Sequence, residues 1–160
     1  MKVHNVQRGF TLIELMVVVA VLAIVATVAV PSFQQLIENN RLATESNRIL
    51  SAISFARSEA VRVGDDVSLT ADSGGFDEGW CVHLGADCDA ANGLRQFDAI
   101  NQLDYSGSAN SLTLNSRGEM TNAAFNISLE PSGCEAGETD KTRTITVSLS
   151  GRGSTQKGDC

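Results

Sequence analysis

The hydrophobic positions of this chain form three patterns that follow one another. Residues 10–30 are apolar almost throughout, and the polar side chains among them are Thr11, Glu14 and Thr27. As a helix, this stretch would extend about 31 Å at about 1.5 Å per residue, which is one hydrocarbon thickness of a bilayer. The sequence therefore predicts a membrane-spanning helix close to the N-terminus.

The second pattern covers residues 32–63, where apolar side chains recur at spacings of three and four. No Pro or Gly interrupts this stretch before Gly64. The spacing predicts that the helix continues with one apolar face against a core, and that Gly64 ends it. The expected core positions are Ile49, Leu50, Ile53, Ala56, Ala60 and Val61. The charged side chains between them are expected on a solvated face.

The third pattern begins after Gly64, where Gly, Ser, Asn, Asp and Thr separate short β-prone runs. Such runs between turn signals predict strands. We expect them at residues 67–70, 80–84, 94–99, 111–115, 125–130 and 143–149. The predicted fold class is α+β, with a long N-terminal helix packed on an antiparallel β-sheet. The predicted segments are residues 10–31, 32–64 and 65–160.

Glu14 is the unexpected residue of the apolar run. A carboxylate at the centre of a membrane helix costs about 2.5–3.5 kcal/mol, and less near an end, so it calls for a partner. Lys2 and Arg8 precede the run, which predicts a cytoplasmic N-terminus and a periplasmic body. An ordinary signal peptide would be cut after the run, where "ATVAV" offers only poor cleavage contexts.

The segment "RGFTLIEL", from Arg8 to Leu15, resembles the class III signal of type IV pilins and pseudopilins. The resemblance implies that residues 1–9 are a leader, that a prepilin peptidase cuts between Gly9 and Phe10, and that Phe10 is then N-methylated. It implies that Glu14 pairs with the N-terminal amine of a neighbouring subunit. Pro31 matches the helix-bending proline of many pilins, and proline removes a backbone donor in any helix.

A second segment, "FARSEAVR" at residues 55–62, resembles the FimT/FimU/GspH branch of minor pilins and pseudopilins. The resemblance implies a pilin-like fold and a structural subunit of the pilus tip or priming complex, needed for pilus assembly and twitching motility. The alternative is a GspH-like minor pseudopilin of type II secretion. The implied partners are other minor pilins or pseudopilins and the major pilin, first in the inner membrane and then in the fibre.

Charge argues against general nucleic-acid binding. The chain has 12 Lys and Arg against 19 Asp and Glu, a net charge of −7, and an acidic body repels DNA. A local exception is the stretch 141–158, which has four basic residues and no acid: Lys141, Arg143, Arg152 and Lys157. Some relatives in the branch bind DNA through a Gly-Arg-x-Arg motif, so a DNA-binding minor pilin is a third hypothesis. Here Ser154 stands in place of the second Arg.

The chain has four cysteines, Cys81, Cys88, Cys134 and Cys160. Behind a membrane-targeting segment, an even number of cysteines predicts disulfides. Three connectivities are open, and proximity in the sequence favours Cys81–Cys88 with Cys134–Cys160. Zinc binding is not favoured, because no CxxC pair occurs and the histidines do not cluster with the cysteines.

No catalytic or cofactor motif is evident. The sequence lacks a G-x-S-x-G elbow, a Walker loop, HExxH and an EF-hand pattern. His83 lies in the apolar alternation of residues 80–84, which favours a structural role. We therefore expect a protein that is not an enzyme, with no cofactor and no metal.

Overall fold

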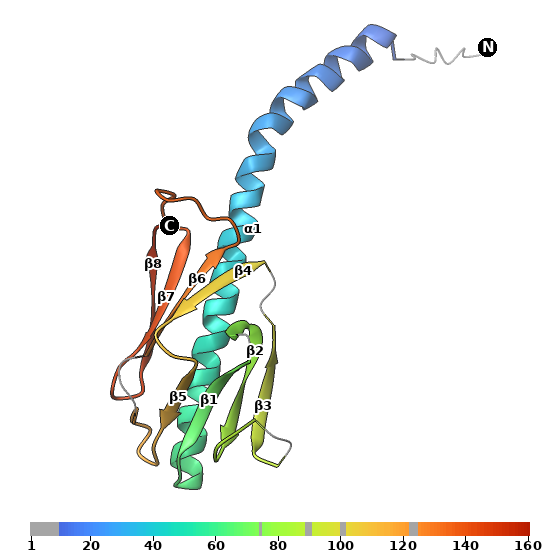
Figure 1. Cartoon of the computed structure of the whole chain (residues 1–160). Helices are drawn as coiled ribbons and strands as arrows, with labels where there is room; N and C mark the ends of the chain where they lie inside the picture. Colours follow the sequence, from blue (N-terminus) through green and yellow to red (C-terminus); the bar gives the residue numbers. More distant parts are fainter. Residues whose placement is uncertain (1–9, 74, 89–90, 100–101, 122–124) are drawn as a thin grey trace, which may run out of the picture. The chain divides into compact units, whose positions relative to one another are not determined.

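The computed structural model describes residues 10–73, 75–88, 91–99, 102–121 and 125–160. Its contacts define two compact units, residues 1–38 and residues 39–160. The helix α1, Leu12–Val63, belongs to both units and is the long ribbon of Figure 1. Its end is as predicted: Gly64 has a φ of +74°, and its amide donates a hydrogen bond to the carbonyl of Ala60 at 3.0 Å. This left-handed conformation favours glycine and stops the helix.

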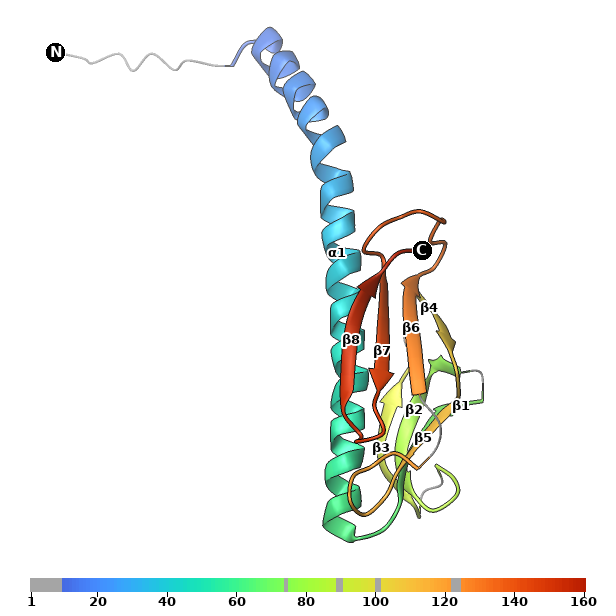
Figure 2. The same cartoon turned by 90° about the vertical axis from the view of Figure 1, so that its left-hand side faces the viewer.

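Eight strands follow α1 and form two antiparallel sheets of four strands each. The strands are β1 Val67–Asp72, β2 Gly75–Leu84, β3 Gly93–Asp98, β4 Leu103–Gly107, β5 Ser111–Leu114, β6 Phe125–Pro131, β7 Thr142–Val147 and β8 Gly153–Gly158. The first sheet has the order β3-β2-β1-β5 and the second has the order β4-β6-β7-β8. The two sheets lie one after the other along the second half of α1, with the first sheet at the Val63 end (Figures 1 and 2).

The α+β class and the pilin-like arrangement are confirmed, and the antiparallel β structure is divided into two sheets. All six predicted strands are present, and β2 is longer than predicted because it begins at Gly75 and not at residue 80. Strands β4 and β8 were not predicted. β8 has the sequence GSTQKG, which contains no large apolar residue, and none of its residues is buried. An edge strand of this kind lacks the alternation on which sequence prediction relies.

One continuous hydrophobic core lies between the second half of α1 and the two sheets. The helix contributes Leu42, Ser46, Ile49, Ala52, Ile53, Ala56 and Ala60 as buried residues. Leu50 is partly buried, as a core position should be, but Val61 was wrongly assigned to the core, because 55% of it is exposed. Phe76 joins the sheets, since its ring centroid lies 5.1 Å from that of Tyr105 and 6.0 Å from that of Phe125.

Arg48 attaches α1 to the first sheet. Its guanidinium carbon lies 4.9 Å from the ring centroid of Trp80, and its Nη2 donates a hydrogen bond to the carbonyl of Asp98 at 3.1 Å. Trp80 is fully buried and stacks on Phe97 at a centroid distance of 5.3 Å. A cation over an indole face is attracted by the negative face of the ring, so this contact adds a specific attachment to the apolar packing.

Candidate functional site

The first unit consists of the apolar half of α1. Among the described residues, α1 is long and apolar enough to cross a membrane. Its large apolar side chains are exposed in the single chain, for example Leu12 at 76% and Ile24 at 69%. A helix that is apolar on all sides requires lipid or other helices around it. This unit is therefore the candidate assembly element.

Glu14 closes a capping box at the start of α1. Its Oε2 accepts a hydrogen bond from the backbone amide of Thr11 at 2.9 Å and another from the Thr11 hydroxyl at 3.1 Å. The amide of Glu14 donates to the Thr11 hydroxyl oxygen at 3.2 Å in return. This reciprocal pattern satisfies amides that a helix leaves unpaired at its first turn. The Thr-x-x-Glu spacing is the sequence signal that predicts this capping box.

The other oxygen of Glu14, Oε1, has no hydrogen-bond partner among the described residues. One carboxylate can therefore cap its own helix through Oε2 and accept a cation through Oε1. Phe10, which would carry the new amine, is 87% exposed. Gly9, on the other side of the predicted cleavage point, lies outside the described residues.

Pro31 lies inside α1, and the helix continues through it. Proline has no amide hydrogen, so the carbonyl of Thr27, four residues earlier, loses its helical partner. The nearby hydroxyls bond to carbonyls of their own turns: Thr27 donates to Ile24 at 2.7 Å and Ser32 to Val28 at 3.1 Å. Backbone bonding is thus weakened locally without ending the helix.

The structure contains both disulfides that sequence proximity favours, Cys81–Cys88 and Cys134–Cys160. The second bridge attaches the last residue to the loop between β6 and β7. There the amide of Cys160 also donates to the carbonyl of Glu138 at 3.0 Å. The C-terminus is therefore fixed both covalently and by hydrogen bonds.

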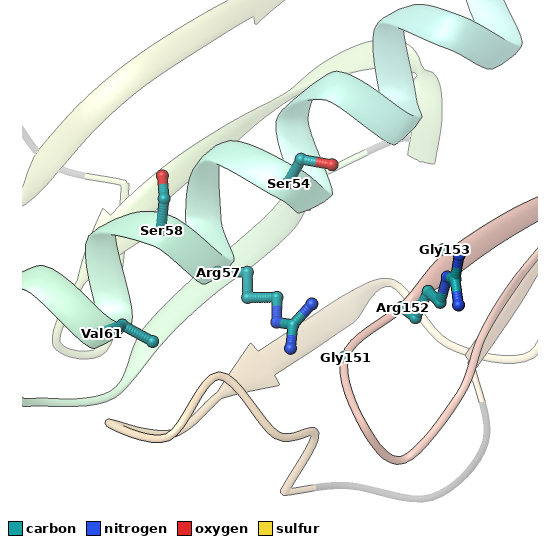
Figure 3. Close-up of a pocket in the computed structure, with 7 residues that line it drawn as sticks. All are labelled: Ser54, Arg57, Ser58, Val61, Gly151, Arg152 and Gly153. Atoms are coloured by element: carbon teal, nitrogen blue, oxygen red, sulfur yellow. The ribbon is translucent and has the colours of Figure 1, made fainter.

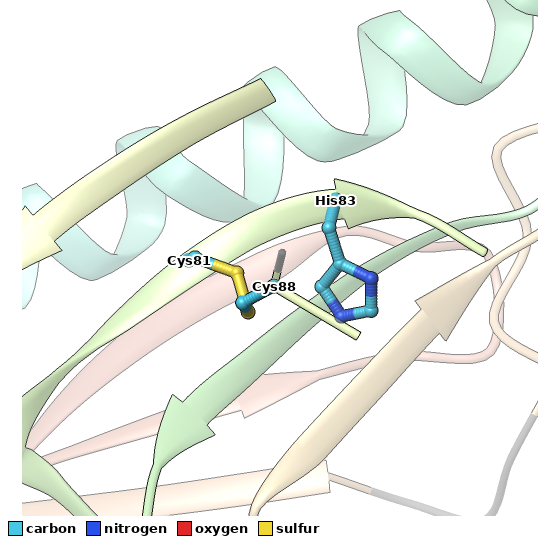
Figure 4. Close-up of side chains that lie close together, drawn as sticks. All are labelled: Cys81, His83 and Cys88. Atoms are coloured by element: carbon cyan, nitrogen blue, oxygen red, sulfur yellow. A yellow bond between two sulfur atoms is a disulfide. The ribbon is translucent and has the colours of Figure 1, made fainter. Parts of the chain in front are cut away.

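His83 lies beside the Cys81–Cys88 bridge, and these three side chains are close enough to one another to be a candidate metal site (Figure 4). The sulfurs are joined to each other, so no thiolate is available as a ligand. The Nε2 atom of His83 lies 2.9 Å from the Thr70 hydroxyl, and the ring is buried. The His83 ring is thus held inside the body by its contact with Thr70.

A groove of about 600 Å³ opens between the last turns of α1 and the turn that joins β7 to β8. Figure 3 shows Arg57 extending from α1 toward the turn that contains Gly151 and Arg152. The remaining lining residues are Ser54, Ser58, Val61, Gly151 and Gly153, so none of the described residues that line the groove is an acid. Arg57 was not among the predicted site residues.

The turn that carries Arg152 depends on Gly151. Gly151 has a φ of +70°, and a Cβ placed there would lie 2.1 Å from the carbonyl oxygen of Gly118. A larger residue would therefore be strained and would displace the turn.

The structure separates the four basic residues that the sequence grouped together. Arg143 and Lys157 are opposite each other in the β7–β8 register, and Lys141 directly precedes β7. Arg152 lies at the other end of the hairpin, five residues from Lys157, or roughly 17 Å along a strand. The predicted DNA-contacting set is thus not one patch.

The comparisons with known proteins agree with these features. The family described as "Type II transport protein GspH" matches residues 45–151. The "Prokaryotic N-terminal methylation motif" matches residues 4–30. The two matches correspond to the two units. The motif match covers the apolar half of α1, and the family match covers most of the β-rich body.

Similar sequences come from pilins. A fimbrial protein of Pseudomonas aeruginosa is 37% identical over 65 residues, which are 41% of this chain and 42% of the relative. The type IV major fimbrial protein FimA of Dichelobacter nodosus is 42% identical over 52 residues, 31% of this chain and 33% of the relative. The chain thus matches less than half the length of these relatives.

Similar solved structures cover about three quarters of this chain. The type IV minor pilin FimU of Pseudomonas aeruginosa has a TM-score of 0.62 at 23% identity, over 74% of this chain and 90% of the other. The minor pseudopilin EpsH of the Vibrio cholerae type 2 secretion system has a TM-score of 0.53 at 16% identity, over 73% and 97%. These likenesses show the fold. Because the family match spans more than half of the residues, the chain belongs to the GspH family, and its fold is pilin-like.

Proposed function

We propose that this protein is a minor type IV pilin, a non-catalytic structural subunit of the complex that primes pilus assembly at the tip. The observation that carries the proposal is the capped Glu14 at the start of an exposed apolar helix, in front of a body tied by two disulfides. The apolar helix and the methylation motif fit a pilin that is anchored in the membrane and ends up in the fibre.

The proposed mechanism uses the two units in turn. Before assembly, residues 10–31 span the inner membrane, and prepilin peptidase removes residues 1–9. On leaving the bilayer, the same apolar surface packs against helices of other minor pilins and the major pilin. Glu14 sets the axial register, because its carboxylate seeks the amine of a neighbouring chain in a surrounding where either charge alone is costly. The body selects particular neighbours.

A minor pseudopilin of type II secretion is the second candidate. The printed description of the matching family favours it, and its helix would work in the same way. Two disulfides tilt the proposal toward the pilus, because a subunit displayed outside the cell gains most from a covalently tied body.

A deletion strain separates the two candidates. Loss of surface pili and twitching with normal exoprotein secretion supports the minor pilin, whereas loss of secretion with normal pili supports the pseudopilin. Complementation with the wild-type gene is the control. Normal pili, twitching and secretion in the deletion strain would reject both candidates.

A further inference from the structure

A second groove of the body contains a cationic pair with no described counter-charge. The groove has a volume of about 280 Å³ and lies between α1 and the edge strand β8. Arg143 and Lys157 line it together with Ala43, Ser46, Asn47, Thr155 and Gln156. No acidic side chain is among the lining residues.

Arg143 is the buried member of the pair, with only 6% of its surface exposed. Its Nη1 donates to the carbonyls of Asp140 at 2.9 Å and Thr142 at 2.7 Å, and its Nη2 donates to Asn39 Oδ1 at 3.3 Å. All three acceptors are neutral. Among the described ion pairs none includes Arg143. A guanidinium cannot lose its proton in a protein, so its charge stays.

Lys157 adds a second positive charge at the same place. It is the direct cross-strand neighbour of Arg143 in the register of β7 and β8, so both side chains leave the sheet on the same face. Like charges opposite each other destabilise a sheet, and a buried charge without an opposite charge is costly. The pair therefore favours binding of an anion from outside the described chain.

We propose that Arg143 and Lys157 form a site for a side-chain carboxylate of an adjoining subunit. This inference rests on the proposed function and adds a specific contact to it. A planar carboxylate fits a guanidinium fork beside a lysine. The acidic body, at −9 for residues 10–160 (10 Lys and Arg against 19 Asp and Glu), disfavours a polyanion such as DNA.

The structure also supplies the chemical probe. After the predicted cleavage, the chain has two lysines, Lys141 and Lys157. A water-soluble carbodiimide activates a carboxylate, and a lysine amine in contact with it displaces the resulting urea and forms an amide bond. Cells that express the full-length protein are treated with the reagent. Membranes and sheared fibres are then analysed separately by mass spectrometry of crosslinked peptides.

The expected result is an amide between Lys157 and an Asp or Glu of another subunit. Lys157→Arg removes this product while retaining the charge. Arg143→Gln lowers its yield by about tenfold, because a charge-assisted hydrogen bond to the carboxylate is lost. Arg57→Gln, a change at the other groove, leaves the yield unchanged and is the matched control. Crosslinks from Lys141 show that the reagent reached the protein.

Three results would overturn the inference. One is the absence of intermolecular Lys157 crosslinks in both fractions while Lys141 reacts. Another is a Lys157 yield that Arg143→Gln does not change. The third is loss of duplex-DNA binding in the Arg143→Gln and Lys157→Gln variants without any protein crosslink, which would assign the pair to phosphate. Failure of the proposed function can be distinguished from failure of this inference. If the proposed function is wrong, the chain will be missing from the fibres, whether or not Lys157 forms crosslinks in membranes.

Discussion

The backbone amide of Thr11 donates a hydrogen bond to Glu14 Oε2 at 2.9 Å, and the amide of Glu14 donates to the Thr11 hydroxyl oxygen at 3.2 Å. This reciprocal contact gives Glu14 a role inside its own chain before any subunit joins it. The carboxylate is held in one orientation, with Oε1 left for another donor. A charge that seems out of place in an apolar run is therefore tolerated because of local hydrogen bonds, and its second oxygen is free for the docking role that we propose.

Glu14→Ala is expected to leave cleavage after Gly9 largely intact and to lower incorporation into fibres by about tenfold or more, because a buried charge pair loses one partner. The measurement is the ratio of the chain in sheared fibres to the chain in membranes, by quantitative immunoblot. Thr11→Val is the matched control. It weakens the helix cap by about 1 kcal/mol but keeps the carboxylate, so incorporation should stay near normal. Normal incorporation of Glu14→Ala would refute the docking role.

The two disulfides are expected to stabilise the body unequally. The bridges close loops with sequence separations of 7 for Cys81–Cys88 and 26 for Cys134–Cys160. Loop-closure entropy predicts losses in the free energy of unfolding of about 2.5 and about 3.5 kcal/mol when each pair is replaced by alanine. The sole tryptophan, Trp80, is fully buried and reports unfolding in urea by its fluorescence. A larger loss for the Cys81–Cys88 pair would contradict this ordering.

Arg48→Ala is expected to lower the free energy of unfolding by about 1–2 kcal/mol, because it removes the cation over Trp80 and a hydrogen bond to the Asp98 carbonyl. Arg48→Lys should lose less than Arg48→Ala, since a cation remains. Arg57→Ala is the control on the same helix. Arg57 is exposed, so its replacement should change stability by less than about 0.5 kcal/mol. Equal losses of stability in Arg48→Ala and Arg57→Ala would contradict the role of Arg48 in attaching α1 to the first sheet.

The free energy of unfolding of the body should fall at alkaline pH, and part of this fall should come from ionisation of Tyr105. Burial raises the pKa of this phenol above its usual 10.0, and the negative charge of Asp77 raises the pKa further. The folded state thus favours the neutral phenol, and this stabilisation is complete below pH 10 and is lost as the pH rises through the folded pKa. Tyr105→Phe should therefore lose less stability above pH 10 than the wild type does.

Tyr105 is the only tyrosine of the chain, so its phenolate absorbance can be titrated directly in the folded and the urea-unfolded protein. The folded protein should titrate at the higher pH. Coincident titration curves would show that burial does not perturb the phenol.

Periodicity predicted the parts of the fold that follow from apolar spacing. α1 and the six predicted strands carry regular apolar positions that meet the core, so their pattern is visible in the sequence. β8 could not be found in this way, because it is an edge strand without large apolar residues. The division into two sheets depends on which strands pair far apart in sequence, as β1 does with β5. Local patterns do not contain that information.

The candidate site shows the same limit. The sequence identified Glu14, and the Thr-x-x-Glu spacing could also have predicted its cap. The grouping of Arg152 with Arg143 and Lys157 failed, because residues close in sequence lie at opposite ends of the β7–β8 hairpin. Arg57 was missed because its groove is formed by segments almost a hundred residues apart, near Arg57 on α1 and near Arg152 on the turn. The burial of Arg143 could not be predicted either, because it depends on the packing of β7 against α1, which is far away in the sequence.

The central claim is that residues 10–31 are retained as the assembly helix of a pilus subunit. Mass spectrometry of the protein recovered from sheared surface fibres tests it most directly. The account predicts a minor component of the fibres whose first residue is N-methylated Phe10. A chain that begins after Ala29, or one that is absent from fibres while present in membranes, would contradict it.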